Sequence, residues 1–397
     1  MSYGEELRDI ATRYLKEWAG LTRTITTSVL YRSKDHFGLG LTDLVTHLKK
    51  MQVCRMHIHK YSQDVESRKL YEYLKDKNKA PTNGLGIPMR PKIWKPTNAL
   101  EEAERNIYLD RIAFGQSTKY NKQKSGVRLD RHTTLKRIEA DDEESRMVKC
   151  YNYVLQGDWL NFDAVLRADL GWNALIYSYP QELFKFLINS THNVLPTPDN
   201  LKRWGKTVVD IKCNLCGSPS ATLKHILNGC PMALNQGRFT WRHDNVLQCI
   251  VKEIESKIEK INSINNYNRS IKDSFINFVK EGKPPSGKSS YKPGLLYTAN
   301  DWILTYDKSH DPLIFPPHIV QTSLRPDLII HSNITKQVIL IELTVPTEDN
   351  IIDWHARKEE KYAKLVDDIS MNKWTGHVYG IEVGSRGYVA KSVIFAF

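Results

Sequence analysis

The last quarter of the chain contains two short apolar runs rich in Ile, Leu and Val, each associated with one acidic residue. The first run follows Arg325-Pro326-Asp327, and the second encloses Glu342. Asn333 and Lys336 lie between the runs, so the pattern predicts two adjacent strands of a buried sheet. Further strands are predicted over residues 295–304, 378–383 and 389–397.

Elsewhere the apolar residues recur with the spacing of a helix. Leu7, Ile10 and Tyr14 lie three or four residues apart, which places them on one face of a predicted helix. After Pro346, Thr347 can cap another helix. Helical patterns cover most of residues 3–75, 146–206, 246–258 and 348–369.

These elements predict an α+β multidomain chain with a mostly helical N-terminal part and a C-terminal mixed-sheet domain. The middle stretch is rich in Pro and Gly and then in Lys, which predicts a basic, flexible linker. The expected order is a helical region (1–75), the linker (76–145), a second helical region (146–210), a zinc knuckle (211–235) and the sheet domain (236–397).

The net charge, the apolar runs and the cysteines restrict the classes of partner and cofactor that the chain is expected to have. The chain of 397 residues carries a net charge of +12, which favours a polyanionic partner. It contains no run of eighteen apolar residues and no charged-then-apolar signal pattern at its start, so neither a membrane span nor a secretory leader is expected. Three of the six cysteines are clustered, which favours an intracellular metal site over a disulfide framework.

That cluster is the sharpest local motif. Two residues separate Cys213 from Cys216, eight lead to His225, and four more lie before Cys230. Three thiolates and one imidazole complete the tetrahedral shell of Zn²⁺, and a Cys-x-x-Cys pair can wrap one side of the ion. The knuckle could contact nucleic acid or could only hold the fold together, and the sequence leaves both roles open.

The two strand carboxylates suggest a second site. A carboxylate inside a buried strand is costly unless a cation or hydrogen bonds compensate it. Asp327 and Glu342 on neighbouring strands therefore suggest a hard-metal site, since Mg²⁺ takes oxygen ligands. The alternative is a strand-edge Asp and a Glu paired with Arg or Lys. Lys358 and Lys361 lie beside the apolar stripe of the following helix, and either ammonium could reach toward the sheet.

Together these residues resemble the PD-(D/E)-x-K nuclease pattern, with fourteen residues between Asp327 and Glu342. More closely, they are similar to the restriction-like endonuclease at the C-terminus of site-specific non-LTR retrotransposon proteins. The knuckle spacing, Arg242-His243-Asp244 just after it and residues 195–201 before it follow the same order in that family. Residues 15–75 resemble the thumb-like segment that follows the reverse transcriptase palm.

The resemblance implies a Mg²⁺- or Mn²⁺-dependent endonuclease that acts on double-stranded DNA in the nucleus, with element RNA as a second partner. Asp327 and Glu342 would hold the catalytic metal. Thr344 stands where most of the wider class has the lysine, so the family implies a lysine from the next helix. That lysine maps to Lys361, with Lys358 as runner-up. The residues implied to contact nucleic acid are Arg242, His243, Arg325, Lys358 and Tyr362.

The chain also lacks a feature of the longer family proteins. Neither Asp141-Asp142 nor Asp367-Asp368 is flanked by strand-type residues as in a polymerase palm, which predicts no polymerase activity. The chain would then derive from an element that has lost its palm. The alternative function is a zinc-dependent DNA- or RNA-binding module, a retrotransposon remnant whose nuclease pattern is catalytically silent.

Overall fold

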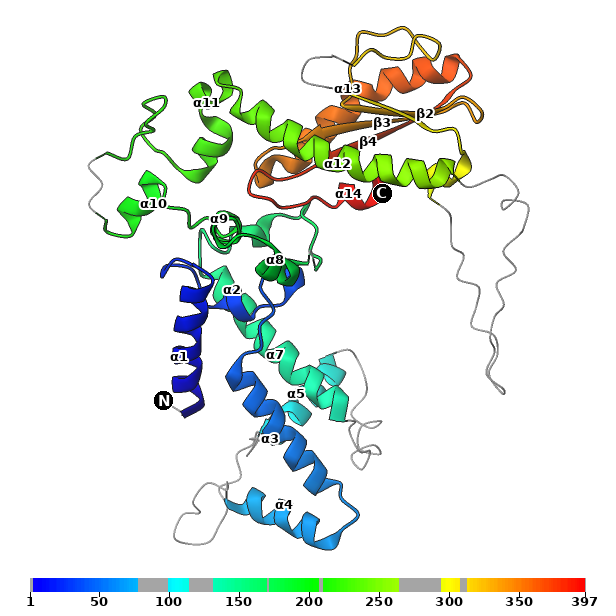
Figure 1. The fold of residues 1–397 in the computed structure, drawn as a ribbon. Helices are drawn as coiled ribbons and strands as arrows, with labels where there is room; N and C mark the ends of the chain where they lie inside the picture. Colours follow the sequence, from blue (N-terminus) through cyan, green and yellow to red (C-terminus); the bar gives the residue numbers. More distant parts are fainter. Residues whose placement is uncertain are drawn as a thin grey trace, which may run out of the picture. The chain divides into compact units, whose positions relative to one another are not determined.

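The computed structural model describes residues 3–77, 99–113, 131–169, 171–206, 210–263, 294–307 and 313–396. The chain divides into two compact units (Figure 1). The first combines Met1–Asp158 with Arg167–His192, and the second combines Trp159–Leu166 with Asn193–Phe397. Within the described ranges, no helix combines the length and the apolar composition that a membrane span requires.

The first unit is helical, as predicted. Helix α3 packs against four other helices of the unit, and a small apolar core forms among them around Val53, Leu100 and Ile138. The helices of eight or more residues are α1 (Tyr3–Trp18), α3 (Leu44–Lys60), α4 (Val65–Lys77), α5 (Ala99–Ala113), α7 (Arg131–Tyr151) and α9 (Gln181–Thr191). The shorter ones are α2 (Ser28–Tyr31), α8 (Trp172–Ser178) and the 3₁₀ turn Lys34–His36, and a further 3₁₀ turn, Asp158–Asn161, begins at the last residue before the second unit.

The linker prediction is wrong for part of residues 76–145. Helix α5 and the first half of α7 lie in this range and pack against each other and against α3. Leu100, Ala103 and Ile107 are buried at helical spacing, which is enough apolar surface to hold α5 on the core. Residues 78–98 and 114–130, which include the Lys-rich stretch, lie outside the described residues.

A fully buried arginine joins distant parts of this unit. The guanidinium of Arg32 donates to Phe37 O over 3.1 Å, lies 2.9 Å from the Cys150 sulfur and lies 3.0 Å from His192 Nε2. A buried charge is tolerated only where hydrogen bonds replace its hydration.

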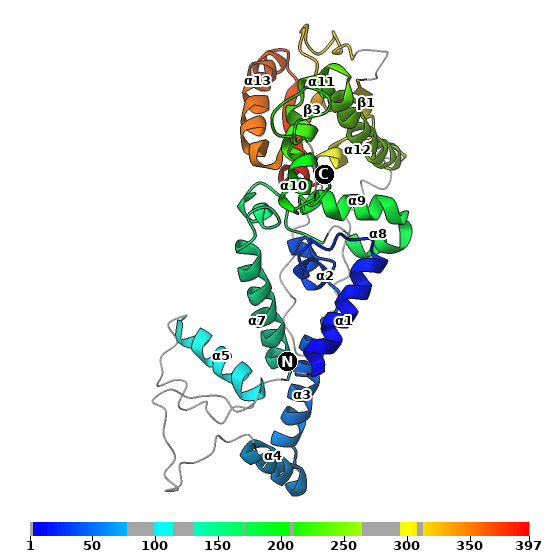
Figure 2. The ribbon, with the colours of Figure 1, turned by 90° about the vertical axis from the view of Figure 1, so that its left-hand side faces the viewer.

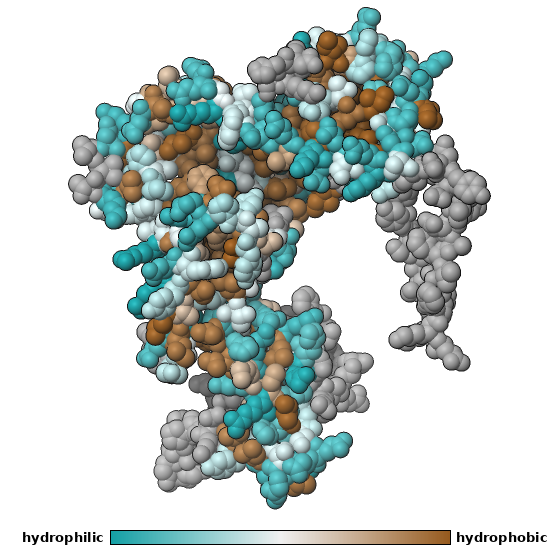
Figure 3. All heavy atoms as spheres, in the orientation of Figure 1, coloured by the Kyte–Doolittle hydropathy of each residue, from teal (hydrophilic) through white to brown (hydrophobic). Residues whose placement is uncertain are grey.

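The predicted apolar stripe of helix α1 is exposed, and Figure 3 shows apolar side chains on the surface over this helix.

The second unit is built on a four-stranded sheet in the order β1-β2-β3-β4. The strands are β1 (Ile303–Tyr306), β2 (Leu328–Ser332), β3 (Gln337–Thr344) and β4 (Thr375–Glu382). The β1–β2 and β2–β3 pairs are antiparallel, whereas β3 and β4 are parallel and joined through α13 (Ile351–Met371). The sheet is therefore mixed, as predicted.

Helices cover both faces of this sheet (Figure 2). Side chains alternate along β3, so Ile339, Ile341 and Leu343 share an apolar cluster with α12 (Arg238–Asn262). Val338 and Leu340 face the other way and pack against the apolar stripe of α13. The remaining short elements are α10 (Pro198–Arg203), the π-helical turn His225–Gly229, α11 (Pro231–Asn235), the 3₁₀ turns Leu295–Thr298 and Glu348–Asn350, and α14 (Ser392–Ala396).

Two predicted strands differ from the structure. Of residues 295–304, only Ile303 and Leu304 enter β1, and Leu295–Thr298 form a 3₁₀ turn held by the hydrogen bond from Trp302 Nε1 to Leu296 O. Of the predicted strand 389–397, the described residues 389–396 form no strand of the sheet. Val389 makes an isolated bridge to Val383, its carbonyl accepts from Leu166 N, and the chain then enters α14. Ala390 N donates to Glu382 O at the end of β4, but the neighbouring groups Val389 O and Lys391 N bond to residues 164–166. The segment therefore makes only isolated bridges and adds no strand.

Candidate active site and metal centre

The cysteine-rich motif folds around a tight turn. Gly217 N donates to Cys213 O over 2.8 Å, and Gly217 adopts φ of +71°, a conformation that favours glycine. Cys213 N in turn donates to Ser218 O over 2.9 Å. The turn brings the thiols of Cys213 and Cys216 to one side, where they face the His225–Gly229 turn.

The four side chains converge as a metal shell requires. Their ligand atoms all lie within 4.8 Å of one another. Sulfur atoms at two corners of a Zn²⁺ tetrahedron are about 3.8 Å apart for Zn–S bonds of about 2.3 Å, and Cys213 Sγ and Cys230 Sγ are 3.9 Å apart. Cys216 Sγ lies 3.3 Å from His225 Nε2. The cluster Cys213, Cys216, His225 and Cys230 could therefore hold a zinc ion.

The electrostatics of the turn favour the same conclusion. Backbone N–H groups of Cys216 and Leu215 point at the Cys213 thiol and lower its pKa to about 6. A thiolate is the form that binds metal. Among the residues that the structure describes, this is the only group of three or more Cys, His, Asp or Glu side chains close enough to share one ion.

Arg242 joins the cysteine cluster to the sheet. Its guanidinium donates to Leu227 O over 2.9 Å and to Asn228 Oδ1 over 3.2 Å, both in the turn that carries His225. It also lies 3.5 Å from Val345 O, just beyond β3, and Asn228 Nδ2 donates to the same carbonyl. Arg242 was expected to contact nucleic acid, and the structure instead places most of its hydrogen bonds within the protein.

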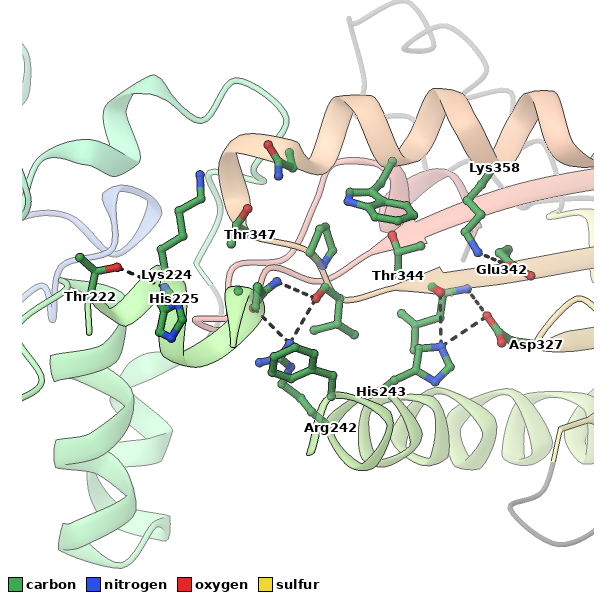
Figure 4. A pocket seen from close by; sticks show the side chains of 18 residues that line it. Thr222, Lys224, His225, Arg242, His243, Asp327, Glu342, Thr344, Thr347 and Lys358 are labelled. Atoms are coloured by element: carbon green, nitrogen blue, oxygen red, sulfur yellow. Dashed lines mark hydrogen bonds and ion pairs between the residues drawn. The ribbon is translucent and has the colours of Figure 1, made fainter. Parts of the chain in front are cut away.

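A cavity of about 730 Å³ lies between this turn and the end of the sheet. Asp327 just before β2, Glu342 from β3 and Lys358 from α13 line it together. Figure 4 shows these three side chains at one end of the cavity and Thr222, Lys224 and His225 at the other. The two predicted carboxylates and one of the two candidate lysines are thus brought into a single cavity.

Glu342 is the most constrained of these groups. It is 4% exposed, and α13 supplies its polar partners. Tyr362 OH donates to Glu342 Oε2 over 2.7 Å, and Lys358 Nζ forms an ion pair with Oε1. Burial and then the Glu342 carboxylate raise the pKa of Tyr362, which keeps the phenol protonated as a donor.

The structure brings both candidate lysines to Glu342, but in different ways. Lys361 Nζ lies 3.4 Å from Glu342 Oε1 and donates to Tyr362 OH over 2.9 Å. Its side chain is 40% exposed and is not part of the cavity wall, whereas that of Lys358 is 19% exposed and lines the cavity. The catalytic assignment of Lys361 remains a prediction, and the geometry favours Lys358.

Asp327 is held by the backbone of β3 and by α12. Leu343 N donates to Asp327 Oδ2 over 2.7 Å, and His243 Nε2 lies 3.5 Å from the same oxygen. His243 Nδ1 lies 3.2 Å from Asp244 Oδ1. Burial alone would lower the pKa of His243, but Asp327 and Asp244 outweigh it and raise that pKa to about 9. His243 is therefore a cation that faces a carboxylate.

The other residues expected to contact nucleic acid lie differently. Arg325 is exposed, and its backbone carbonyl oxygen lies 3.0 Å from Tyr362 OH. Tyr362 is fully buried, so it lies in the core instead of on a surface that nucleic acid could touch. Its predicted contact role is corrected because its hydroxyl is used to hold Glu342.

Glu382, another buried carboxylate of the sheet, was not among the predicted site residues. Glu382 on β4 is 1% exposed, and its two oxygens accept from His355 Nδ1 over 2.9 Å and from Ser392 Oγ over 2.6 Å. These residues line a separate cavity of about 410 Å³. The signal was present, since Glu382 lies among strand-type residues just as Glu342 does. Its partners come from α13 and α14, which the sequence did not bring together.

No protein-family model matches this chain, and no curated protein is similar to it. The described residues form two candidate functional centres. One is a Cys₃His cluster that could hold zinc, and the other is a cavity that joins two carboxylates to a lysine.

We predict that the purified protein binds one Zn²⁺ through Cys213, Cys216, His225 and Cys230. The combined Cys213→Ser and Cys216→Ser substitutions should abolish zinc in metal analysis and loosen the surrounding residues in hydrogen exchange, because structural zinc contributes about 10 kcal/mol or more to local folding. Cys249→Ser changes an exposed cysteine of α12 and should have no effect. A zinc content that is unchanged in the double variant would contradict the assignment.

We also predict a pH dependence of stability from His243 in protein kept free of divalent cations. The folded pKa is raised from 6.5 to about 9, so the stabilisation is fully present below pH 6.5 and is lost as pH rises through about 9. The difference in thermal midpoint between the wild type and His243→Gln should shrink across that window. His47→Gln, at an exposed position of α3, should show no such trend. A difference that grows with pH would refute the charge state.

Proposed function

We propose that this protein is a metal-dependent endonuclease of the PD-(D/E)-x-K type that hydrolyses phosphodiester bonds in DNA. One observation carries the proposal: Asp327, Glu342 and Lys358 come from three different elements and line the same cavity. A purely structural pairing of strand carboxylates with cations would not require a cavity of about 730 Å³ next to them.

The donor set fits a hard divalent cation. Asp327 and Glu342 supply carboxylate oxygens, which Mg²⁺ and Mn²⁺ prefer over nitrogen and sulfur. Each carboxylate is oriented by a neutral donor, Leu343 N for Asp327 and Tyr362 OH for Glu342. A cation bound there would polarise the scissile phosphate and lower the pKa of a water.

The chain's own residues supply the rest of the reaction. Water adds to phosphorus, one P–O bond breaks, and the leaving oxygen takes up a proton. We assign Lys358 to neutralise the charge that develops on the phosphate, because its ammonium is at the cavity wall. Lys361 would hold Tyr362 and Glu342 in place from the helix surface. His243 would hold Asp327 from the opposite side.

The fold supports the same proposal at the level of the domain. A mixed sheet flanked by helices, with both carboxylates at its β2–β3 pair, is the architecture expected of a restriction-endonuclease-like domain over residues 236–397. An origin in a retrotransposon polyprotein without its palm, a nuclear location and DNA or element RNA as partners stay predictions from the resemblance.

A second function is favoured by a different observation. Lys358 pairs with Glu342, and His243 lies against Asp327, so each carboxylate already faces a cation of the protein. These pairs could neutralise the two carboxylates without any divalent ion. The protein would then be a zinc-dependent nucleic-acid-binding module whose nuclease site is silent.

We predict that the zinc-loaded wild type nicks or cuts plasmid DNA with Mg²⁺ or Mn²⁺, and that Asp327→Ala cleaves at least about 100-fold more slowly. DNA affinity should be kept or improved, because the substitution removes a metal ligand and also a negative charge near the phosphate. Asp353→Ala, at an exposed position of α13, is the control. If the folded wild type cuts neither supercoiled nor nicked DNA, the enzyme proposal fails and the binding module replaces it.

The same assay decides between the two lysines. Lys358→Ala should lose most of the cleavage activity, whereas Lys361→Ala should lose less, since only Lys358 lines the cavity. Lys364→Ala tests a third, exposed lysine of α13 and should cleave normally. If Lys361→Ala loses more cleavage activity than Lys358→Ala, Lys361 is the catalytic lysine, as the family resemblance implies, and the metal-dependent mechanism is unchanged.

Both candidate functions require nucleic-acid binding. With a net charge of +12, we predict micromolar or tighter association with duplex DNA that weakens at least about tenfold between about 50 and 200 mM salt. Fluorescence anisotropy over a salt series measures the slope. An affinity that does not respond to salt would exclude an electrostatic mode and would point to a protein partner.

A further inference from the structure

Thr344 is the last residue of β3 and lies two residues beyond Glu342, so both side chains point to the α13 face of the sheet. Thr344 lines the same cavity as Asp327, Glu342 and Lys358. Figure 4 shows its side chain on the side of β3 from which Lys358 descends. Thr344 therefore stands next to the reacting groups assigned above.

The hydroxyl of Thr344 is buried without a hydrogen-bond partner among the described residues. The residue is 9% exposed. Its cross-strand neighbour in the register is Glu382, whose carboxylate accepts from His355 and Ser392 but makes no hydrogen bond with Thr344. An unpaired buried hydroxyl costs about 1–3 kcal/mol, so its presence in a folded protein calls for a reason.

A second donor in the cavity is also unpaired. Arg242 Nε has no hydrogen-bond partner among the described residues, although the other guanidinium nitrogens are bonded to carbonyl and amide oxygens. Arginine Nε can only donate, and a threonine hydroxyl can donate. A cavity wall with two unused donors and a lysine is suited to a ligand rich in acceptor oxygens, such as a phosphodiester.

We infer that Thr344 Oγ1 donates a hydrogen bond to a non-bridging oxygen of the scissile phosphate, which makes Thr344 a catalytic residue alongside Lys358. This inference rests on the proposed nuclease function. A β-branched side chain on a strand has few χ1 choices, so the hydroxyl is pre-oriented at little entropic cost. A donor fixed in this way stabilises charge that develops on the phosphate without reorganisation during the reaction.

The test compares Thr344→Val, which removes the hydroxyl and keeps the shape, with Thr344→Ser, which keeps the hydroxyl. Full-length, zinc-loaded protein is assayed with Mg²⁺ at saturating duplex DNA. Thr344→Val should cleave about 10-fold to 100-fold more slowly, with DNA affinity within about twofold of the wild type, and Thr344→Ser should recover most of the rate. Thr375→Val, at the exposed start of β4, is the control.

Thermal stability separates this role from a structural one. Because the hydroxyl has no partner among the described residues, Thr344→Val should melt no lower than the wild type. If Thr344→Val melts at a lower temperature than the wild type and Thr344→Ser does not restore the cleavage rate, Thr344 has a structural role and the inference is overturned. A cleavage rate of Thr344→Val within about twofold of the wild type would also overturn the inference. A loss of DNA affinity without a loss of cleavage rate would overturn it too, because the hydroxyl would then bind a phosphate other than the scissile one.

The outcome for the nuclease itself is read separately. If the wild type cleaves, Asp327→Ala does not, and Thr344→Val matches the wild type, only the assignment of Thr344 fails. If the wild type does not cleave at all, the proposed function fails and takes the role of Thr344 with it.

Discussion

The burial of the Glu342 carboxylate is the constraint on which the sheet domain depends. A charge that is 4% exposed must be compensated within the protein, and the compensation comes from Lys358, Lys361 and Tyr362, all on α13. These three contacts hold α13 against β3 at the level of Glu342. The same position presses His355 against β4, where any side chain at Gly380 would lie 2.9 Å from His355 Nδ1. One buried charge thus positions a helix, two strands and the cavity beside them.

The cysteine cluster belongs to the same physical unit as this cavity. Arg242 bonds to the carbonyl of Leu227 in the turn that carries His225, and it approaches the carbonyl of Val345 at the end of β3. Metal at the cluster would order that turn, and the turn forms one end of the cavity. The cysteine cluster therefore contributes to the cavity through packing and hydrogen bonds, whether or not it touches nucleic acid.

Many of the helices and strands were predicted correctly from the sequence. Strands β2 and β3 follow from two apolar runs, and α1, α12 and α13 follow from helical spacing, because burial on one face imposes these periods. The errors have a common cause. Helix α5 lies in a stretch dominated by Pro, Gly and Lys on either side, and residues 389–391 have strand-type composition but bond to residues 164–166. Composition cannot show which distant backbone a segment will pair with.

The types and the order of the candidate site residues can be recognised in the chain alone: Cys213, Cys216, His225 and Cys230, then Asp327 and Glu342, then two lysines one turn apart. Spacing within one turn or one strand is enough for that, since local geometry is regular. Three features could be recognised only in the folded protein: Lys358 lines the cavity, His243 faces Asp327, and the Thr344 hydroxyl has no partner among the described residues. All three features depend on the position and rotation of helices that are remote in the sequence from the strands they cover. The packing of whole layers of side chains between helix and sheet sets that position.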